Sequence, residues 1–186
     1  MTSDERIVAK QIGRPPRGMA RVEARCAFGY PTVVSVDPLV AHRKGRGAAE
    51  PFPTRFWLTC PVLVEQVSRI EASGLIDALE GDAREDPAFA ARLAGDHARC
   101  AAERWEAADA DARETAARRR LLPVLRDSGI GGVRDHRTVK CLHAQYAHHL
   151  ARGNAVGEIL DVRHAPQECS DDAVRCRAFG PPPEEV

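Results

Sequence analysis

The sequence has no long hydrophobic run and no recognisable secretory leader. Nowhere do about 18 apolar residues follow one another, which is the length that a membrane-spanning helix requires. Residues 1–14 are polar and lack the apolar segment of a signal peptide. These absences argue against a membrane protein and predict a cytoplasmic location.

The chain also has no excess charge of either sign and almost no lysine. It carries 27 basic and 27 acidic side chains, and this balance argues against nucleic-acid binding through bulk electrostatics. Only Lys10, Lys44 and Lys140 are lysines, so the remaining 24 of the 27 basic residues are arginines. Arginine can bind phosphate or carboxylate groups, but most of these arginines alternate with acidic residues, as on solvated helix faces.

Several catalytic signatures are missing. There is no Cys-x-x-Cys pair, no Gly-x-Ser-x-Gly and no His-Glu-x-x-His, which excludes the usual zinc-ribbon, thioredoxin-like and zincin motifs. The glycine-rich residues 129–132 are not followed by the Lys-Ser/Thr of a phosphate-binding loop. We interpret them as a hinge, and any metal site must be assembled by the tertiary fold.

The sequence does contain the patterns of a small α+β domain. Its 186 residues, 44% of them hydrophobic and 29% charged, are typical of one soluble globular domain. Residues 22–26 alternate with period two, residues 32–36 are β-branched, and residues 55–59 are the most aromatic stretch. We therefore expect a small antiparallel sheet in the N-terminal third, with a Gly-rich and Pro-rich loop at residues 41–53.

Helices are expected to cover this sheet. A short one fits residues 4–12, another begins at Pro61, a long charged helix or helical hairpin spans residues 86–120, and a last strong one fits residues 139–151 with Thr138 as its N-cap. We interpret residues 1–157 as a single domain and residues 158–186 as a polar, Pro-containing and flexible tail.

The densest group of reactive side chains lies between residues 139 and 150. Cys141, His143 and His148 fall within eight residues, and Cys141 would lie in the first turn of its helix, where the helix dipole favours a thiolate. Cys60 has a similar position before Pro61. These four residues, with Cys26 as a further candidate, are our predicted site for zinc or iron, or for a reactive thiolate.

Helical spacing limits this interpretation. Cys141 and His148 would share a face but stand about 10 Å apart along the axis, while Cys141 and His143 can face each other only if the helix begins later than predicted. The alternative is that the cysteines are small buried residues and the histidines surface residues. Cys169 and Cys176 could bind a metal only if the tail is ordered.

Three motifs resemble a known family. They are residues 51–61 (PFPTRFWLTCP), 67–74 (VSRIEASG) and 139–148 (VKCLHAQYAH), and residues 25–34 (RCAFGYPTVV) are similar to the same family's N-terminal segment. This family is DUF501, and the resemblance covers about residues 7–157. It implies a small cytosolic bacterial protein, mainly actinobacterial, without an established activity, often encoded near a septum-formation initiator and an exopolyphosphatase. Its Cys-x-His motif falls on Cys141 and His143.

Two classes of function follow. In the first, a Cys/His site built from Cys60, Cys141, His143 and His148 binds zinc or iron, where four protein ligands would indicate a structural role and three plus water a hydrolytic one. In the alternative, the protein is a non-catalytic interaction module whose charged segment 86–120 docks a partner linked to septum formation or polyphosphate metabolism. An enzyme that binds phosphate through the arginines is a third reading, which no loop motif favours.

Overall fold

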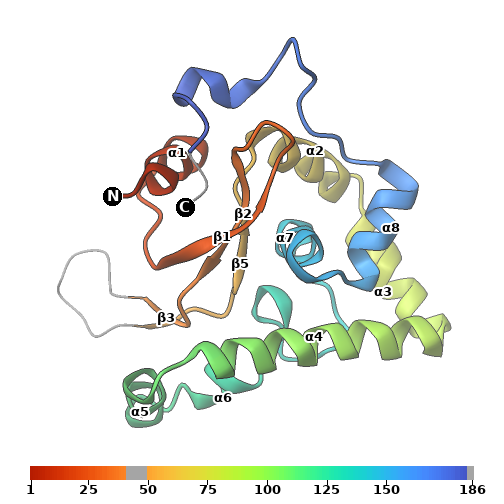
Figure 1. Ribbon diagram of the computed structural model, residues 1–186. Coiled ribbons are helices and arrows are strands. Elements are labelled where there is room, and N and C mark those ends of the chain that lie inside the picture. The colour runs from red at the N-terminus through yellow and green to blue at the C-terminus, as the bar shows by residue number, and fades with distance from the viewer. Residues whose placement is uncertain (41–49, 184–186) are drawn as a thin grey trace.

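A computed structural model describes residues 1–40 and 50–183 and has the expected α+β architecture (Figure 1). The main sheet contains β1 (Met19–Arg25), β2 (Pro31–Val36) and β5 (Phe56–Leu58), antiparallel in the order β1-β2-β5. Two short strands, β3 (Leu39–Val40) and β4 (Glu50–Pro51), flank the interval 41–49. The predicted loop at 41–53 therefore lies in part outside the described residues.

β2 forms the centre of this sheet because its sequence suits burial on both faces. All six of its residues are buried, and the β-branched valines pack well on a pleated surface. Val34 faces Val22 of β1 and Trp57 of β5. The β1–β2 turn includes Gly29 at φ 79°, a left-handed conformation that favours glycine.

Helices and short 3-10 turns make up most of the remaining described chain. Thr2 and Glu5 form a capping box at the first helix, whose end is marked by Gly13 in the left-handed conformation. The elements are α1 (Ser3–Ile12), α2 (Pro61–Ala72), α3 (Leu75–Glu85), α4 (Pro87–Ala107), α5 (Ala110–Arg118), α6 (Leu122–Arg126), η1 (Ile130–Gly132), α7 (Leu142–Arg152), α8 (Ala155–His164) and η2 (Arg175–Phe179).

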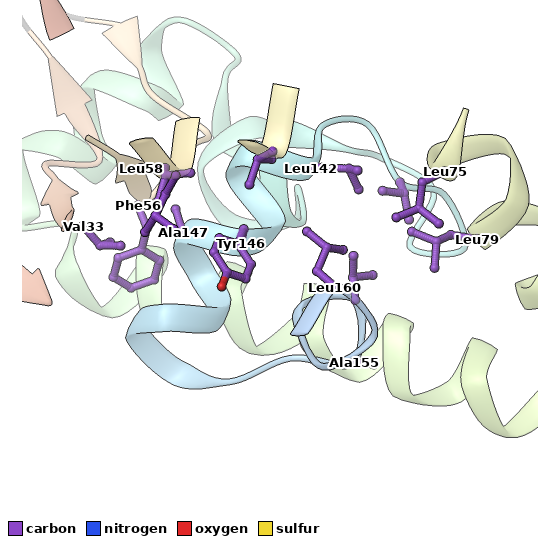
Figure 2. Packing of buried hydrophobic residues seen from close by; sticks show 14 of the residues in the cluster. Val33, Phe56, Leu58, Leu75, Leu79, Leu142, Tyr146, Ala147, Ala155 and Leu160 are labelled. Carbon is purple, nitrogen blue, oxygen red and sulfur yellow. The ribbon is translucent and has the colours of Figure 1, made fainter. Parts of the chain in front are cut away.

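The hydrophobic core surrounds α7, which packs against β5, α8 and α2. Leu142 and Ala147 of α7 are fully buried. Figure 2 shows Ala147 and Tyr146 between the sheet residue Phe56 and Leu160 of α8, and Leu142 belongs to the same cluster. Each large apolar side chain contributes about 1.5–3 kcal/mol when it is fully buried. The helix that carries His143, and that Cys141 immediately precedes, is thus fixed at the centre of the molecule.

The charged segment 86–120 is less solvent-exposed than its composition suggests. It is divided into α4 and α5 at residues 108–109, and α4 buries seven side chains, among them the polar Asp96, His97 and Arg104. The Arg104 side chain is fully buried and donates from Nε to the Leu125 carbonyl at 2.8 Å and from Nη1 to the Pro53 carbonyl at 2.8 Å.

The helix expected at residues 139–151 begins three residues later. α7 starts at Leu142, and Cys141 is its N-cap in an extended conformation with φ −158°. Two carboxylates explain the shift, because Glu80 Oε1 accepts from the Val139 N–H at 3.0 Å and Glu71 Oε2 accepts from the Leu142 N–H at 2.6 Å. Thr138, the predicted N-cap, instead donates its hydroxyl hydrogen to the Asp135 carbonyl at 2.8 Å.

The C-terminal segment lies against the N-terminal helix (Figure 1). α8 extends to His164, beyond the domain boundary predicted at residue 157, and η2 contacts α1. Lys10 Nζ donates to the Phe179 carbonyl at 2.6 Å. Among the described residues, no helix has both the length and the apolar character needed to cross a membrane.

Candidate metal centre

Glu71, Cys141 and His143 bring three ligand atoms together where the last turn of α2 meets the start of α7. A carboxylate oxygen, the thiol sulfur and an imidazole nitrogen all lie within 4.8 Å of one another. All three side chains are half-buried. Among residues 1–40 and 50–183, this is the one such group of three or more His, Cys, Asp or Glu ligands.

One ring nitrogen of the His143 imidazole faces the other two members of this group. Its Nδ1 lies 3.8 Å from the Cys141 sulfur and 3.5 Å from Glu71 Oε2. On the other side, Nε2 lies 2.9 Å from Ser68 Oγ and 3.3 Å from the Val64 carbonyl.

The partners of Nε2 determine where the proton of a neutral His143 lies. The Ser68 hydroxyl donates its hydrogen to the Val64 carbonyl at 2.8 Å, so its oxygen accepts from Nε2–H, and the carbonyl can only accept. Both contacts therefore hold the proton on Nε2, which leaves the Nδ1 lone pair directed at the group. Histidine ligands of metals commonly have this arrangement, with the remote N–H donated to a carbonyl or another acceptor.

The electrostatics of the group favour positive charge at its centre. The contact with Cys141 is the main cause that raises the pKa of His143 above its ordinary value, and Glu71 adds to it, while burial acts in the opposite direction. Glu71 also accepts from an amide at the N-terminus of α7, a position that stabilises the carboxylate. A proton or a metal cation at Nδ1 would be attracted by the same two neighbours.

The extended Cys141 is what allows Cys141 and His143 to meet. On a regular helix, side chains two residues apart point in different directions, but Cys141 precedes α7 and has β-type backbone angles. The condition set out from the sequence, a later helix start, is met in the structure.

The other sequence-predicted residues lie away from this group. Cys60 is the N-cap of α2, and the eleven residues from there to Glu71 correspond to about 16 Å along a helix axis. His148 is buried, with Nδ1 3.1 Å from Asn154 Nδ2 and its ring 5.6 Å from that of Phe56. Burial lowers the pKa of His148 to about 3.

Cys26 follows β1 and packs in a different cluster, with Tyr30 and Cys176. The structure therefore unites Cys141 with His143, and it places Cys60, His148 and Cys26 elsewhere.

Sequence reasoning missed Glu71. The available signal was its place in residues 67–74, one of the three motifs that carried the family resemblance, where Ser68 and Glu71 are three residues apart and share one face of a helix. Nothing in the sequence showed that this face would meet the start of α7.

Comparison with known proteins supports the resemblance. A family model described as "Protein of unknown function (DUF501)" matches residues 22–161. No curated protein and no solved structure matches the chain. Because the family model covers three-quarters of the sequence and includes Glu71, Cys141 and His143, the chain belongs to the DUF501 family.

Proposed function

We propose that this protein binds a transition-metal ion, with zinc as the best fit, through Glu71, Cys141 and His143. The observation that carries the proposal is the shared direction of the ligand atoms, since the Cys141 sulfur and the Glu71 carboxylate both face His143 Nδ1. A thiolate, an imidazole and a carboxylate are all common zinc ligands.

The distances agree with a tetrahedral ion. Bonds of about 2.0–2.3 Å to nitrogen, oxygen and sulfur place neighbouring ligand atoms about 3.2–3.8 Å apart. The separations of 3.8 Å and 3.5 Å from Nδ1 are in this range. The ion would then need small side-chain adjustments and no change in the backbone.

The same geometry does not suit a Cys-His-Glu triad, which is one way to activate the reactive thiolate that the sequence allows at Cys141. In a triad, the histidine contacts the nucleophile with one ring nitrogen and the acid with the other. Here both contacts are on Nδ1, while Nε2 is directed at Ser68 and Val64. The metal interpretation agrees with all the contacts of the two His143 ring nitrogens, whereas a triad would require the imidazole ring to flip by about 180°.

Three protein ligands leave the fourth position of a tetrahedral ion for water or a substrate. Zinc bound in this way supplies an acidic water or polarises a carbonyl or phosphoryl oxygen. In this role Ser68 and Val64 would fix the His143 ring, and the Leu142 amide would orient Glu71. The function supported best is therefore a metal centre with an open coordination position, of the kind found in hydrolytic enzymes.

Metal titration of three variants tests this proposal. Untagged protein is stripped with a chelator and titrated with Zn²⁺ by calorimetry, and Cys141→Ser, His143→Ala and Glu71→Gln should each lose one binding event. Glu71→Gln retains an oxygen that can accept from the Leu142 N–H, so it separates ligation from helix capping. His164→Ala, at the exposed end of α8, is the matched control.

The proposal fails if the wild-type protein shows no Zn²⁺-binding event beyond those that the three variants also show. If Zn²⁺ binding is absent and Cys141 alone reacts rapidly with an alkylating agent, the reactive-thiolate alternative replaces it.

Two further proposals are consistent with the fold. All six cysteines are free thiols, which supports a reducing, cytoplasmic location. The interaction-module alternative has less support, because one whole face of α4 is buried against the rest of the protein, including Phe89, Leu93 and Arg104. Only its outer face remains for a partner linked to septum formation or polyphosphate metabolism.

A further inference from the structure

Four of the six cysteines lie around one interface, away from the Glu71 group. Cys26 follows β1, Cys60 precedes α2, and Cys169 and Cys176 come from the C-terminal segment after α8. Cys176 is buried in an apolar cluster against which Cys26 and Cys169 also pack. Cys60 is buried at the neighbouring edge of the main core.

Hydrogen bonds join Cys176 to the start of α2, where Cys60 lies. The side-chain amide of Gln11 donates both to the Cys176 sulfur at 3.4 Å and to the Pro31 carbonyl at 2.8 Å. The hydroxyl of Thr59, the residue before Cys60, donates to the same Pro31 carbonyl at 3.3 Å. One carbonyl group thus links the two cysteine-bearing segments.

A second link joins Cys26 to Cys169 through their neighbours in the chain. The Ala27 N–H donates to Glu168 Oε2 at 2.9 Å, and the Cys26 N–H donates to the Tyr30 carbonyl at 2.9 Å. The four thiols therefore surround one junction, where the C-terminal segment crosses the β1–β2 turn and the start of α2.

Positively polarised groups lie beside two of these thiols. Burial raises the pKa of Cys60 to about 11 and also raises that of Cys176, so both are neutral and poor nucleophiles without a cation. The amides of Val62 and Leu63, at the N-terminus of α2, and the guanidinium of Arg175 act in the opposite direction on these two thiols. They would offset part of the negative charge of a thiolate site.

We propose that Cys26, Cys60, Cys169 and Cys176 form a second metal site, a four-thiolate site for Zn²⁺ that fastens the C-terminal segment to the β1–β2 turn and α2. Four sulfur ligands select zinc among the common divalent cations. Binding is a ligand exchange in which the thiol protons leave to solvent and no electron is transferred.

We expect rotation of the cysteine side chains to close this site. Among the described residues, no three of these sulfurs lie within 4.8 Å of one another. To bind one ion they must therefore move closer together by more than the ligand atoms of the Glu71 group. A change of cysteine rotamer moves the sulfur by about 3 Å while the backbone stays in place.

Cobalt titration of the untagged, reduced, full-length protein tests the proposal independently of the Glu71 site. The near-ultraviolet charge-transfer absorbance of bound Co²⁺ grows with the number of thiolate ligands. We expect absorbance for about five thiolates, counting four here and one at Cys141. Cys176→Ser and Cys169→Ser should remove most of it, Cys141→Ser about one-fifth, and Cys100→Ser, on α4 outside both groups, none.

Alkylation of the wild-type protein provides a second measurement, and its result does not depend on whether any variant folds. Zn²⁺ should protect Cys26, Cys60, Cys169 and Cys176 together from an alkylating agent, as mapped on peptides by mass spectrometry.

Three results would overturn the four-thiolate site. The first is a cobalt absorbance that corresponds to one thiolate and disappears in Cys141→Ser. This result would mean that only the Glu71 site binds metal. The second is a disulfide among the four in protein isolated without air, and the third is an iron–sulfur chromophore in place of zinc.

Discussion

Two buried histidines should make the protein lose stability in mild acid. His97 and His148 are fully or almost fully buried, and burial lowers their pKa values to about 4 and about 3. The unfolded chain takes up a proton at each near pH 6.5, whereas the folded chain does not until pH 4 or below. Their contribution to stability is therefore complete above pH 6.5 and is lost as the pH falls toward these folded values.

The size of the effect follows from this difference in pKa. Between pH 7 and pH 5, protonation of the unfolded state alone costs about 2 kcal/mol per histidine, or about 4 kcal/mol for both. This is a large part of the 5–15 kcal/mol typical of a small domain. Carboxylates with lowered pKa values, such as Asp127 and Asp135, act mainly below pH 4. His143, whose pKa is raised, acts in the opposite direction and offsets part of the loss from the two buried histidines.

Urea unfolding at pH 7, 6 and 5 measures the effect directly. His148→Gln should be less stable at pH 7, because packing against Phe56 is lost, but its stability should fall by about 2 kcal/mol less than the wild type between pH 7 and pH 5. His164→Gln, which changes an exposed histidine, should retain the full slope. Equal wild-type stability at pH 7 and pH 5 would refute the reasoning, as would an unchanged slope in His148→Gln.

Substitutions at three more positions have defined outcomes. Arg104→Met should lower the free energy of unfolding by about 3 kcal/mol, because buried carbonyl groups lose their donor; a loss below 1 kcal/mol in urea titration would contradict this. Gly157→Ala should destabilise by more than about 1 kcal/mol, since its β-carbon would overlap the His149 imidazole, and an unchanged melting temperature would disprove it. Ser68→Ala should weaken Zn²⁺ binding about tenfold through His143, while Ser68→Thr, which keeps the hydroxyl, should restore most of the affinity in the same calorimetric titration.

The sheet could be predicted from sequence because its signals are local. Alternation in residues 22–26 and the β-branched residues 32–36 each indicate a strand without reference to the rest of the chain, and both are strands in the structure. The buried face of α4 could not be predicted in this way. Arg104 is normally a surface residue type, and its partners, carbonyl groups of residues 53, 125 and 128, are far from it in sequence.

The candidate site was predicted in part for the same reason. Cys141 and His143 were visible as a dense local pair, but their geometry depends on where α7 begins. That start is determined by Glu71 and Glu80, which lie 71 and 59 residues before the amides they bind. A capping interaction from a distant helix leaves no periodic signal, so both the late helix start and the third ligand were beyond sequence reasoning.

The position of Cys141 immediately before the core residue Leu142 links ligand binding to melting temperature. Leu142 is fully buried beside α2 and β5, so an ion that ties Cys141 to Glu71 would bind the folded chain far better than the unfolded one. Occupancy at one hundred times the dissociation constant would then add about 2.7 kcal/mol to the free energy of unfolding. A thermal-shift screen of divalent cations, and afterwards of small molecules in the presence of the best one, would thus report occupancy of this centre without any knowledge of the reaction.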